Sequence, residues 1–414
     1  MKMIEIISSN GKLIRAEINT DRIFYANYYV TAKSEQGLYA KLTRRTFYNK
    51  DGSVAYNQIF EKEREYYLFE DGKTCTNAQF IKEFIVKMNL SEKDTVIVDR
   101  TAQFDFVQPL FQFGNKAHFI VVVHSEHYFE KGRDFNWSYQ YFNWEYLYWF
   151  KYLKMIDTIV VSTQEQKDNL LELLHKYHTD VPSIEVIPAG GIEYLQYPEG
   201  ARRSCSLVSV SRLSPRKKVD WLIKGVLKAH EINPDITFDI YGDGSCRSAL
   251  EKIVEEGQAQ SYIRFMGYGD VTNVYRNYEV FVTASICETL GLSTMEAIGS
   301  GAAVIGLDVA YGNRLFVRPE RNGYLISLSA VSSRPVTNDQ NEKWINTAPL
   351  ATDKFIDYDV NDIDEEKLTD VMGEKIVEIF RDDQRLEKFH QISYEIASEF
   401  LNSVIEEKWK KLLM

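Results

Sequence analysis

Residues 1–75 alternate apolar and polar positions, and short turns interrupt the alternation. A two-residue period is typical of β-strands, and an Asn-Gly or Asp-Gly pair between two strands favours a tight hairpin turn. Three such pairs occur, at Asn10-Gly11, Asp51-Gly52 and Asp71-Gly72. The segment is therefore predicted to form an antiparallel β-meander module. Its aromatic-rich face is either a docking surface or only a cover for other parts of the protein.

The hydrophobic pattern changes from residue 76 onward. Residues 95–100, 118–127 and 158–163 are short apolar runs typical of buried strands, and helical patterns separate them. One of these helical patterns is the aromatic-rich stretch 135–150. Strands that alternate with helices indicate a parallel, doubly wound sheet, so we predict a Rossmann-like domain over residues 76–198.

A second series of strands and helices follows a break rich in proline and glycine, and we place the domain linker near residues 191–203. Residues 199–385 are predicted to form a second Rossmann-like domain, with the polar stretch 327–353 as a surface insertion. Helical spacing over 386–414 predicts a C-terminal helix. The predicted fold class is therefore α/β, with two Rossmann-like domains and an N-terminal antiparallel β-meander.

The composition argues against several classes of protein. A net charge of −11 argues against a nucleic-acid-binding protein, which usually has a basic surplus. A membrane helix needs about 18 uninterrupted apolar residues, and no run in the sequence approaches this length. The first residues do not resemble a signal peptide. We therefore expect a cytoplasmic protein, and a peripheral contact with the inner face of the cell membrane stays open. The four cysteines are widely separated, which indicates neither a disulfide framework nor a zinc site.

The stretch from Phe281 to Gly306 carries two carboxylates in a pattern of strand, loop, helix and strand. Glu288 lies in the expected loop, and Glu296 lies eight positions later in the helix that follows Gly291. The start of a helix attracts anions, because its free N–H groups and the positive end of its dipole lie there. A phosphorylated ligand bound at this point can donate hydrogen bonds from its hydroxyl groups to the two carboxylates.

A basic loop precedes this unit in the chain. Residues 211–218 read SRLSPRKK and follow an expected strand, so four cations would lie at the carboxyl end of that strand. A bound diphosphate needs such a pocket, because the charge of the leaving group must be stabilised as a glycosidic bond breaks. A solvated surface loop is the alternative for this segment taken alone, and its association with the two carboxylates favours the phosphate pocket.

In context the two glutamates read S-x-x-E-x-x-G-L-x-x-M-E-A-x-x-x-G. This pattern resembles the nucleotide-sugar-binding segment of the family-four retaining glycosyltransferases. The resemblance implies a GT-B fold, in which two Rossmann-like domains face each other and the last helix crosses back to the first domain. It assigns Glu288 to the donor sugar and Glu296 to the ribose hydroxyl groups. It assigns Arg212 and Lys217 of the R-L-x-x-x-K pattern to the diphosphate.

Four further candidate positions lie in the second domain. The backbone N–H groups near Leu292 and Ser293 would meet the diphosphate. Gly242 would allow close approach of the backbone to the nucleotide, and Tyr268 would lie by the base. A role in a turn is the alternative for Gly242 and Tyr268.

His124 is the candidate in the first domain, because it ends the buried run VVVHSEH. A polar side chain at such a position must find a partner, and a histidine satisfied within the core is the alternative. The resemblance places this histidine against the donor sugar and the acceptor, which gives it a catalytic or positioning role. His127 is a weaker candidate.

From about residue 40 on, the order of motifs is similar to that of the accessory-Sec O-GlcNAc transferases (GtfA-like), with the insertion 327–353 as the main departure. This similarity implies transfer of N-acetylglucosamine from a UDP-sugar to serine and threonine of serine-rich repeat adhesins. It also implies a GtfB-like sister subunit as partner, no metal or other cofactor, and attack from the face that the diphosphate leaves. Thr289 stands where the family commonly has glycine and can tighten the sugar pocket, so the donor sugar stays open.

Two other functions stay open. A teichoic-acid α-glucosyltransferase shares the fold, and its poly(glycerol phosphate) acceptor would require a basic groove in the first domain. A non-catalytic partner or chaperone subunit is the second alternative, and the paired glutamates count against it. The family's first βα unit is expected before the meander, whereas this chain starts within the meander. We therefore expect either a shortened, inactive copy or a part that another chain supplies.

Overall fold

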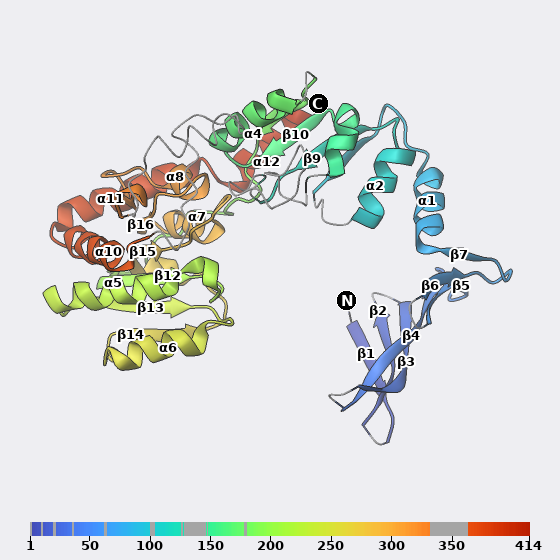
Figure 1. Cartoon of the computed structure of the whole chain (residues 1–414), viewed down its shortest axis with the longest axis horizontal. Coiled ribbons are helices and arrows are strands. Elements are labelled where there is room, and N and C mark those ends of the chain that lie inside the picture. Colours follow the sequence, from blue (N-terminus) through green and yellow to red (C-terminus); the bar gives the residue numbers. More distant parts are fainter. Residues whose placement is uncertain are drawn as a thin grey trace. The chain divides into compact units, whose positions relative to one another are not determined.

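The computed structural model describes residues 2–99, 104–125, 127, 146, 148–177, 180–331 and 363–414, apart from residues 10, 20–21, 35–36 and 62–63 (Figure 1). The chain divides into two compact units. The first consists of Met1–Asp94 with Gln103–His118, and the second of Thr95–Ala102 with Phe119–Met414.

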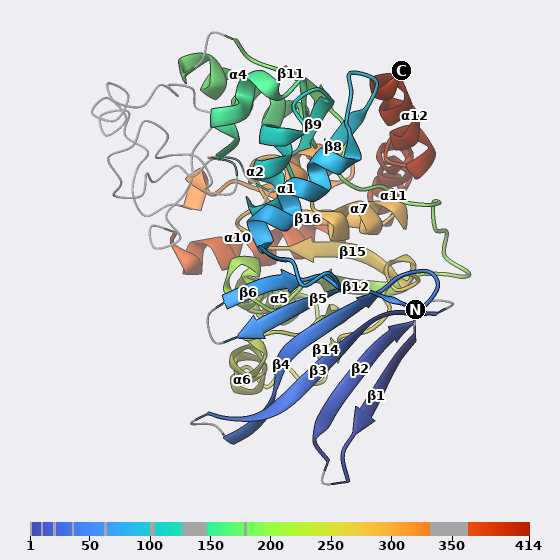
Figure 2. The same cartoon turned by 90° about the vertical axis from the view of Figure 1, so that its right-hand side faces the viewer.

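The first unit is built on a seven-stranded sheet in which each strand pairs with the next in antiparallel fashion (Figure 2). Gly11, Gly52 and Gly72 have positive φ angles of 78°, 88° and 79°, which a glycine adopts without steric cost in a tight turn. The predicted antiparallel meander is therefore confirmed. Its strands are β1 (Lys2–Ile7), β2 (Leu13–Asn19), β3 (Ile23–Ser34), β4 (Gly37–Tyr48), β5 (Val54–Glu61), β6 (Arg64–Leu68) and β7 (Thr74–Thr76).

Aromatic side chains account for much of the packing in this unit. Phe47 stacks on Tyr56 with ring centroids 4.7 Å apart, and Tyr67 stacks on Phe80 at 4.1 Å. Phe80 belongs to helix α1 (Asn77–Met88), which packs against helix α2 (Phe104–Phe113). These aromatic residues therefore serve the core of the unit, and the docking role of its exposed residues stays a prediction.

The second unit contains two sheets, and the first has the strand order β11-β10-β9-β8. Strands β9, β10 and β11 pair in parallel, and β8 lies next to β9. Buried aliphatic residues form one face of this sheet, and Ile405 of the C-terminal helix α12 packs into them. The elements are β8 (Thr95–Val98), β9 (His118–Val122), η1 (Tyr148–Met155), β10 (Thr158–Val161), α4 (Gln164–Tyr177), β11 (Ser183–Val186) and α12 (Asn402–Leu413).

The second sheet is six-stranded and parallel, with the order β14-β13-β12-β15-β16-β17 (Figure 1). From β12 the chain first adds β13 and β14 on one side and then returns to place β15 on the other side. Ligands of doubly wound sheets bind at such a reversal, beyond the carboxyl ends of the strands. The strands are β12 (Arg203–Val210), β13 (Thr237–Tyr241), β14 (Ile263–Gly267), β15 (Tyr278–Thr283), β16 (Ala303–Leu307) and β17 (Gly323–Ile326).

Helices cover this sheet and complete its core. Trp221 and Phe389 are among the largest fully buried side chains there, from α5 and α11. The combination of two parallel sheets with an antiparallel N-terminal sheet confirms the predicted α/β class. The helices are α5 (Val219–Ile232), α6 (Arg247–Glu256), α7 (Leu292–Gly299), α8 (Gly312–Phe316), α10 (Glu365–Ile379) and α11 (Asp383–Ser398).

The C-terminal segment differs from the single helix predicted over 386–414. The chain leaves helical geometry at Leu401, so α11 packs on the second sheet and only α12 packs on the first. The N–H of Asn402 donates to the carbonyl of Ile192 at 2.8 Å, and the N–H of Ile192 donates to the carbonyl of Phe400 at 3.0 Å. This pairing fixes the break beside the linker between the two sheets.

Two predicted segments fall largely outside the described residues. Of the surface insertion 327–353, the structure describes only the first five residues, and Leu328 and Val331 among them are buried in the second core. The start of the stretch is therefore core rather than surface. Of the predicted helix 135–150, only Tyr146 and the first residues of η1 are described.

Candidate functional site

The basic loop and the two-carboxylate unit meet at the reversal of the second sheet. The loop after β12 forms a single 3-10 turn, η2 (Pro215–Lys217), and the N–H of Ile286 donates to the carbonyl of Arg216 at 3.1 Å. Next to this backbone contact, Lys217 Nζ forms an ion pair with Glu288 Oε1, although the two residues are 71 positions apart. The fold therefore brings these two predicted site residues together between the carboxyl ends of β12 and β15.

The pair is partly shielded from solvent, since its side chains are only 25% and 17% exposed. A cation and a carboxylate held here are more strongly coupled than a fully exposed pair. The lysine can exchange this carboxylate for a phosphate oxygen, and the carboxylate is then available to hydroxyl groups. The pair can thus respond to a ligand that carries both groups.

Helix α7 begins at Leu292, four residues after Glu288, and its N-cap Gly291 lies beside Glu288, since an added Cβ would come within 4.0 Å of the Glu288 Cβ. Gly291 precedes it with a φ of 78°, a left-handed conformation that favours glycine. The N–H groups of Leu292 and Ser293 belong to the first turn, where an α-helix provides no acceptor for them. These two predicted donors therefore follow the Glu288 end of the ion pair by four and five residues along the chain.

Glu296 accepts a hydrogen bond from Tyr275 Oη at 2.8 Å. Burial raises the pKa of the Glu296 carboxyl above its ordinary value, and the hydrogen bond from Tyr275 lowers it in part. A pocket of about 190 Å³ opens beside this pair. Gln196 also lines it, and Gln196 Oε1 is buried without a hydrogen-bond partner among the described residues. The Glu296 carboxylate at the wall of this pocket can therefore accept hydrogen bonds from a ligand that carries hydroxyl groups.

The second unit has a first half, built on the sheet β11-β10-β9-β8, and a second half, built on the six-stranded sheet. The remaining predicted residues of the second half lie at the carboxyl ends of neighbouring strands. Arg212 is exposed after β12, and no carboxylate of the described residues pairs with it. Tyr268 follows β14 and is 90% exposed. Gly242 lies against the backbone of the β12 loop, where an added Cβ would come within 1.9 Å of the carbonyl oxygen of Ser211. The contact between two loops thus accounts for glycine at 242 without a ligand.

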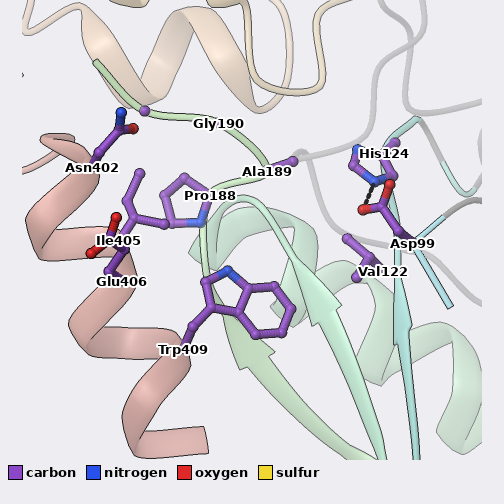
Figure 3. A pocket seen from close by; sticks show the side chains of 11 residues that line it. Asp99, Val122, His124, Pro188, Ala189, Gly190, Asn402, Ile405, Glu406 and Trp409 are labelled. Carbon is purple, nitrogen blue, oxygen red and sulfur yellow. Dashed lines mark hydrogen bonds and ion pairs between the residues drawn. The ribbon is translucent and has the colours of Figure 1, made fainter. Parts of the chain in front are cut away.

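His124 lies beyond the end of β9 and pairs with Asp99, which follows β8, at a distance of 2.7 Å between Nε2 and Oδ1. The two residues lie on one side of a pocket of about 220 Å³, and Glu406 and Trp409 of α12 lie on the other (Figure 3). His124 is 27% exposed, so it is not the satisfied core histidine of the alternative interpretation. Asp99 is a site residue that was not predicted, although a charged residue directly after a buried strand was the available signal.

His127 differs from His124, because it is almost fully buried and neither ring nitrogen has a partner among the described residues. Burial lowers the pKa of His127 to about 3, so its ring is neutral near pH 7. Tyr275 was also missed, since nothing in its local sequence distinguishes it from a core tyrosine. Among the described residues, no helix is long and apolar enough to cross a membrane, and no group of three or more His, Cys, Asp or Glu side chains could hold a metal ion.

Two family descriptions match the chain. The description "Glycosyl transferases group 1" matches residues 204–333, which contain the second sheet and its loops. The description "GtfA extended beta-sheet domain" matches residues 1–71, which contain six of the seven antiparallel strands. The two matches correspond to the predicted second Rossmann-like domain and the predicted β-meander.

Known proteins are similar over almost the whole chain. The UDP-N-acetylglucosamine–peptide N-acetylglucosaminyltransferase GtfA subunit of Streptococcus pneumoniae serotype 4 is 36% identical over 402 residues, which cover 97% of this chain and 72% of that protein. The crystal structure of the pneumococcal O-GlcNAc transferase GtfA in complex with UDP and GlcNAc matches with a TM-score of 0.78 and 35% identity, over 97% of this chain and 72% of that one. A GtfA/B complex matches with a TM-score of 0.76 and 33% identity, over 99% and 74%.

Proposed function

The chain belongs to the family of GtfA subunits of UDP-N-acetylglucosamine–peptide N-acetylglucosaminyltransferases, and within this family of glycosyltransferases we propose that it transfers N-acetylglucosamine from UDP-N-acetylglucosamine to serine and threonine side chains of a serine-rich repeat protein. The observation that carries the proposal is the Lys217–Glu288 pair at the reversal of the second sheet, four residues before the start of α7. A cation, a carboxylate and free N–H groups at one point match a donor that combines a sugar with a diphosphate.

Each group of the site has a role in holding this donor. Arg212, Lys217 and the first N–H groups of α7 bind the diphosphate, because positive charge and N–H donors both favour phosphate oxygens. Glu296 accepts hydrogen bonds from the ribose hydroxyl groups. Glu288, once Lys217 has turned to the phosphate, accepts a hydrogen bond from a hydroxyl group of the sugar.

The reaction replaces one bond at the anomeric carbon with another. The bond between this carbon and the diphosphate oxygen breaks, and the acceptor hydroxyl oxygen bonds to the carbon from the same face. The proton of the hydroxyl passes to the departing diphosphate, so the products are UDP and the glycosylated side chain. Lys217, Arg212 and the start of α7 stabilise the negative charge that develops on the diphosphate, and this reaction needs no metal ion. His124 faces the sugar from the first half.

The acceptor is a long polypeptide, and we propose that a GtfB-like sister subunit helps to hold it. A GtfA/B complex among the similar structures supports this assignment. The reaction takes place in the cytoplasm, where UDP-sugars are available, and peripheral contact of the complex with the membrane would bring it to acceptors before export.

The test is UDP-sugar binding and hydrolysis by the purified chain, alone and with a co-expressed sister subunit. We expect release of N-acetylglucosamine but not glucose, and transfer to a serine-rich peptide but not to poly(glycerol phosphate). Glu296→Ala should abolish UDP binding without lowering the melting temperature by more than a few degrees. Glucose transfer to poly(glycerol phosphate) would replace the proposal with the teichoic-acid function. Absence of UDP binding in both preparations would replace it with the non-catalytic partner function.

A further inference from the structure

Glu165 connects the two halves of the second unit through both of its carboxylate oxygens. It lies in the first turn of α4, on the first sheet's side. Its Oε1 accepts a hydrogen bond from Arg314 Nη1 at 2.7 Å, and its Oε2 accepts one from the backbone N–H of Tyr311 at 3.0 Å. Both partners belong to the segment after β16, in the second half. One carboxylate thus holds a side chain and a backbone group of the facing domain.

Tyr311 has a backbone conformation that needs such support. Its φ of 72° and ψ of −99° lie outside the regions that non-glycine residues usually adopt, and a buried residue keeps such strain only where its surroundings hold it. Besides Glu165, Asn169 of α4 donates a hydrogen bond from Nδ2 to Tyr311 Oη at 3.4 Å. The first half therefore holds this tyrosine at its backbone and at the tip of its side chain.

The same segment supports the backbone of Glu288. Tyr311 and Glu288 form a parallel β-bridge, and the N–H of Gly312 donates to the carbonyl of Glu288 at 2.9 Å. Gly312 fits closely there, because an added Cβ would come within 2.5 Å of the carbonyl oxygen of Leu290. A continuous series of contacts therefore runs from Glu165, through Tyr311 and Gly312, to the backbone of Glu288, whose side chain pairs with Lys217.

Hydrogen bonds hold the start of α4 in place, so the position of Glu165 is defined by its own half. Thr163 Oγ1 accepts a hydrogen bond from the N–H of Gln166 at 3.0 Å, and Gln166 Oε1 accepts one from the N–H of Ser162 at 3.0 Å. On the other side, Asp308 accepts a hydrogen bond from Arg314 Nε at 2.7 Å, which holds the guanidinium toward Glu165. Neither end of the contact between the halves is a freely moving side chain.

We infer that Glu165 is a positioning residue, which orients the sugar-facing carboxylate Glu288 by holding the Tyr311–Gly312 backbone from the opposite half. The inference rests on the proposed function of Glu288. It adds that the geometry of the donor-sugar site depends on the contact between Glu165 of the first half and the Tyr311–Gly312 backbone. The contacts to the diphosphate and ribose do not pass through this segment. Removal of Glu165 should therefore affect the sugar step and spare nucleotide binding.

The test compares Glu165→Ala and Glu165→Gln with the matched control Asp168→Asn, which removes an exposed acid from the same helix. We expect Glu165→Ala to lower kcat for sugar release by about ten- to a hundredfold, the usual effect of losing hydrogen bonds to a charged group, with the Kd for UDP within twofold of wild type. Glu165→Gln keeps one acceptor oxygen for the Tyr311 N–H and should lie between. Asp168→Asn should equal wild type.

Hydrogen exchange of residues 308–316 provides a readout that does not depend on activity. The amides of Tyr311 and Gly312 should exchange faster in Glu165→Ala than in Asp168→Asn, while those of α4 stay unchanged. Unchanged kcat and unchanged exchange in Glu165→Ala would overturn the inference. So would an equal loss of UDP affinity and kcat, which indicates general damage to the donor half. A wild-type chain that binds no UDP would reject the proposed function, and the exchange comparison would still test the coupling.

Discussion

The two Rossmann-like halves of the second unit are built alike but contribute to the site in different ways. Both have a parallel sheet with polar residues beyond the carboxyl ends of the strands. In the second half, Lys217 pairs with Glu288 at these carboxyl ends, and Tyr275, which precedes β15, donates to Glu296. In the first half, His124 pairs with Asp99, whereas Glu165 and Asn169 of α4 contact the opposite half. One half thus contains a binding site, and the other contains groups that act on its geometry.

This difference predicts which step of binding or catalysis a substitution in each half should affect. A change within the second half should remove binding or charge stabilisation directly, because the affected group touches the donor. A change in the first half should leave nucleotide binding intact and alter only the step that involves the sugar. Three further substitutions, each with a comparison variant, test this division.

The largest effect is expected for Lys217→Met. The substitution removes the cation that stabilises the departing diphosphate and leaves Glu288 without its partner in the free enzyme. Loss of one group that stabilises developing charge typically costs about 10²–10³ in kcat. Sugar release measured with saturating UDP-N-acetylglucosamine should fall by this factor.

The control for this experiment is Lys252→Met. Lys252 lies on α6, is 73% exposed and pairs only weakly with Glu256 of the same helix. Its removal changes the net charge equally, so a general electrostatic effect would appear in both variants. If Lys217→Met retained more than a tenth of the wild-type kcat, the diphosphate would have to be stabilised mainly by α7 and Arg212.

A smaller effect is expected for Glu296→Gln, and it should depend on pH. Burial raises the pKa of the Glu296 carboxyl, so the charged form that binds hydroxyl donors best is present above this raised pKa and is lost as the pH falls through it. Affinity for the donor should therefore weaken on acidification in the wild type. Glu296→Gln should bind about tenfold more weakly at pH 7.5 and lack this dependence.

UDP-N-acetylglucosamine is the suitable ligand for this measurement, since the terminal phosphate of UDP itself titrates near about pH 6. Tyr275→Phe sharpens the test. The hydrogen bond from Tyr275 lowers the pKa of Glu296, so its removal should move the loss of affinity to higher pH. A pH profile that is the same in wild type and Glu296→Gln would show that another group controls donor affinity.

The sequence predicted the second half better than the first, and the reason is physical. Glu288 and Glu296 belong to one local unit, whose strand, loop and helix follow from hydrophobic periodicity. Lys217 is distant in sequence, but it also follows a buried strand, and parallel strands end at the same edge of a sheet. Local patterns were therefore sufficient to place most of these residues near one another.

Contacts that join the two halves have no such local signal. Glu165 looks like an ordinary acid in the first turn of a helix, and Tyr311 precedes α8 with a positive φ that a tyrosine does not predict. The break of the C-terminal helix near Leu401 was missed for the same reason. Its pairing with Ile192 is a tertiary contact, and the flanking residues keep helical spacing on both sides.

The smallest effect is expected for Asp99→Asn. Asp99 accepts from His124 and so fixes the orientation and tautomer of the ring, but it is 64% exposed, and solvent weakens such a pair. Asparagine keeps an acceptor oxygen, so kcat should fall only about two- to threefold, a loss within the range of exposed ion pairs. The Kd for UDP should not change.

His124→Ala provides the comparison, because it removes the group that we propose faces the sugar rather than its partner. We expect a larger loss of kcat in this variant, again without a change in UDP affinity. If Asp99→Asn lost as much activity as His124→Ala, the charge of the pair would matter more than the orientation of the ring. The first half would then stabilise charge in the reaction directly, and the division of roles between the two halves would be wrong.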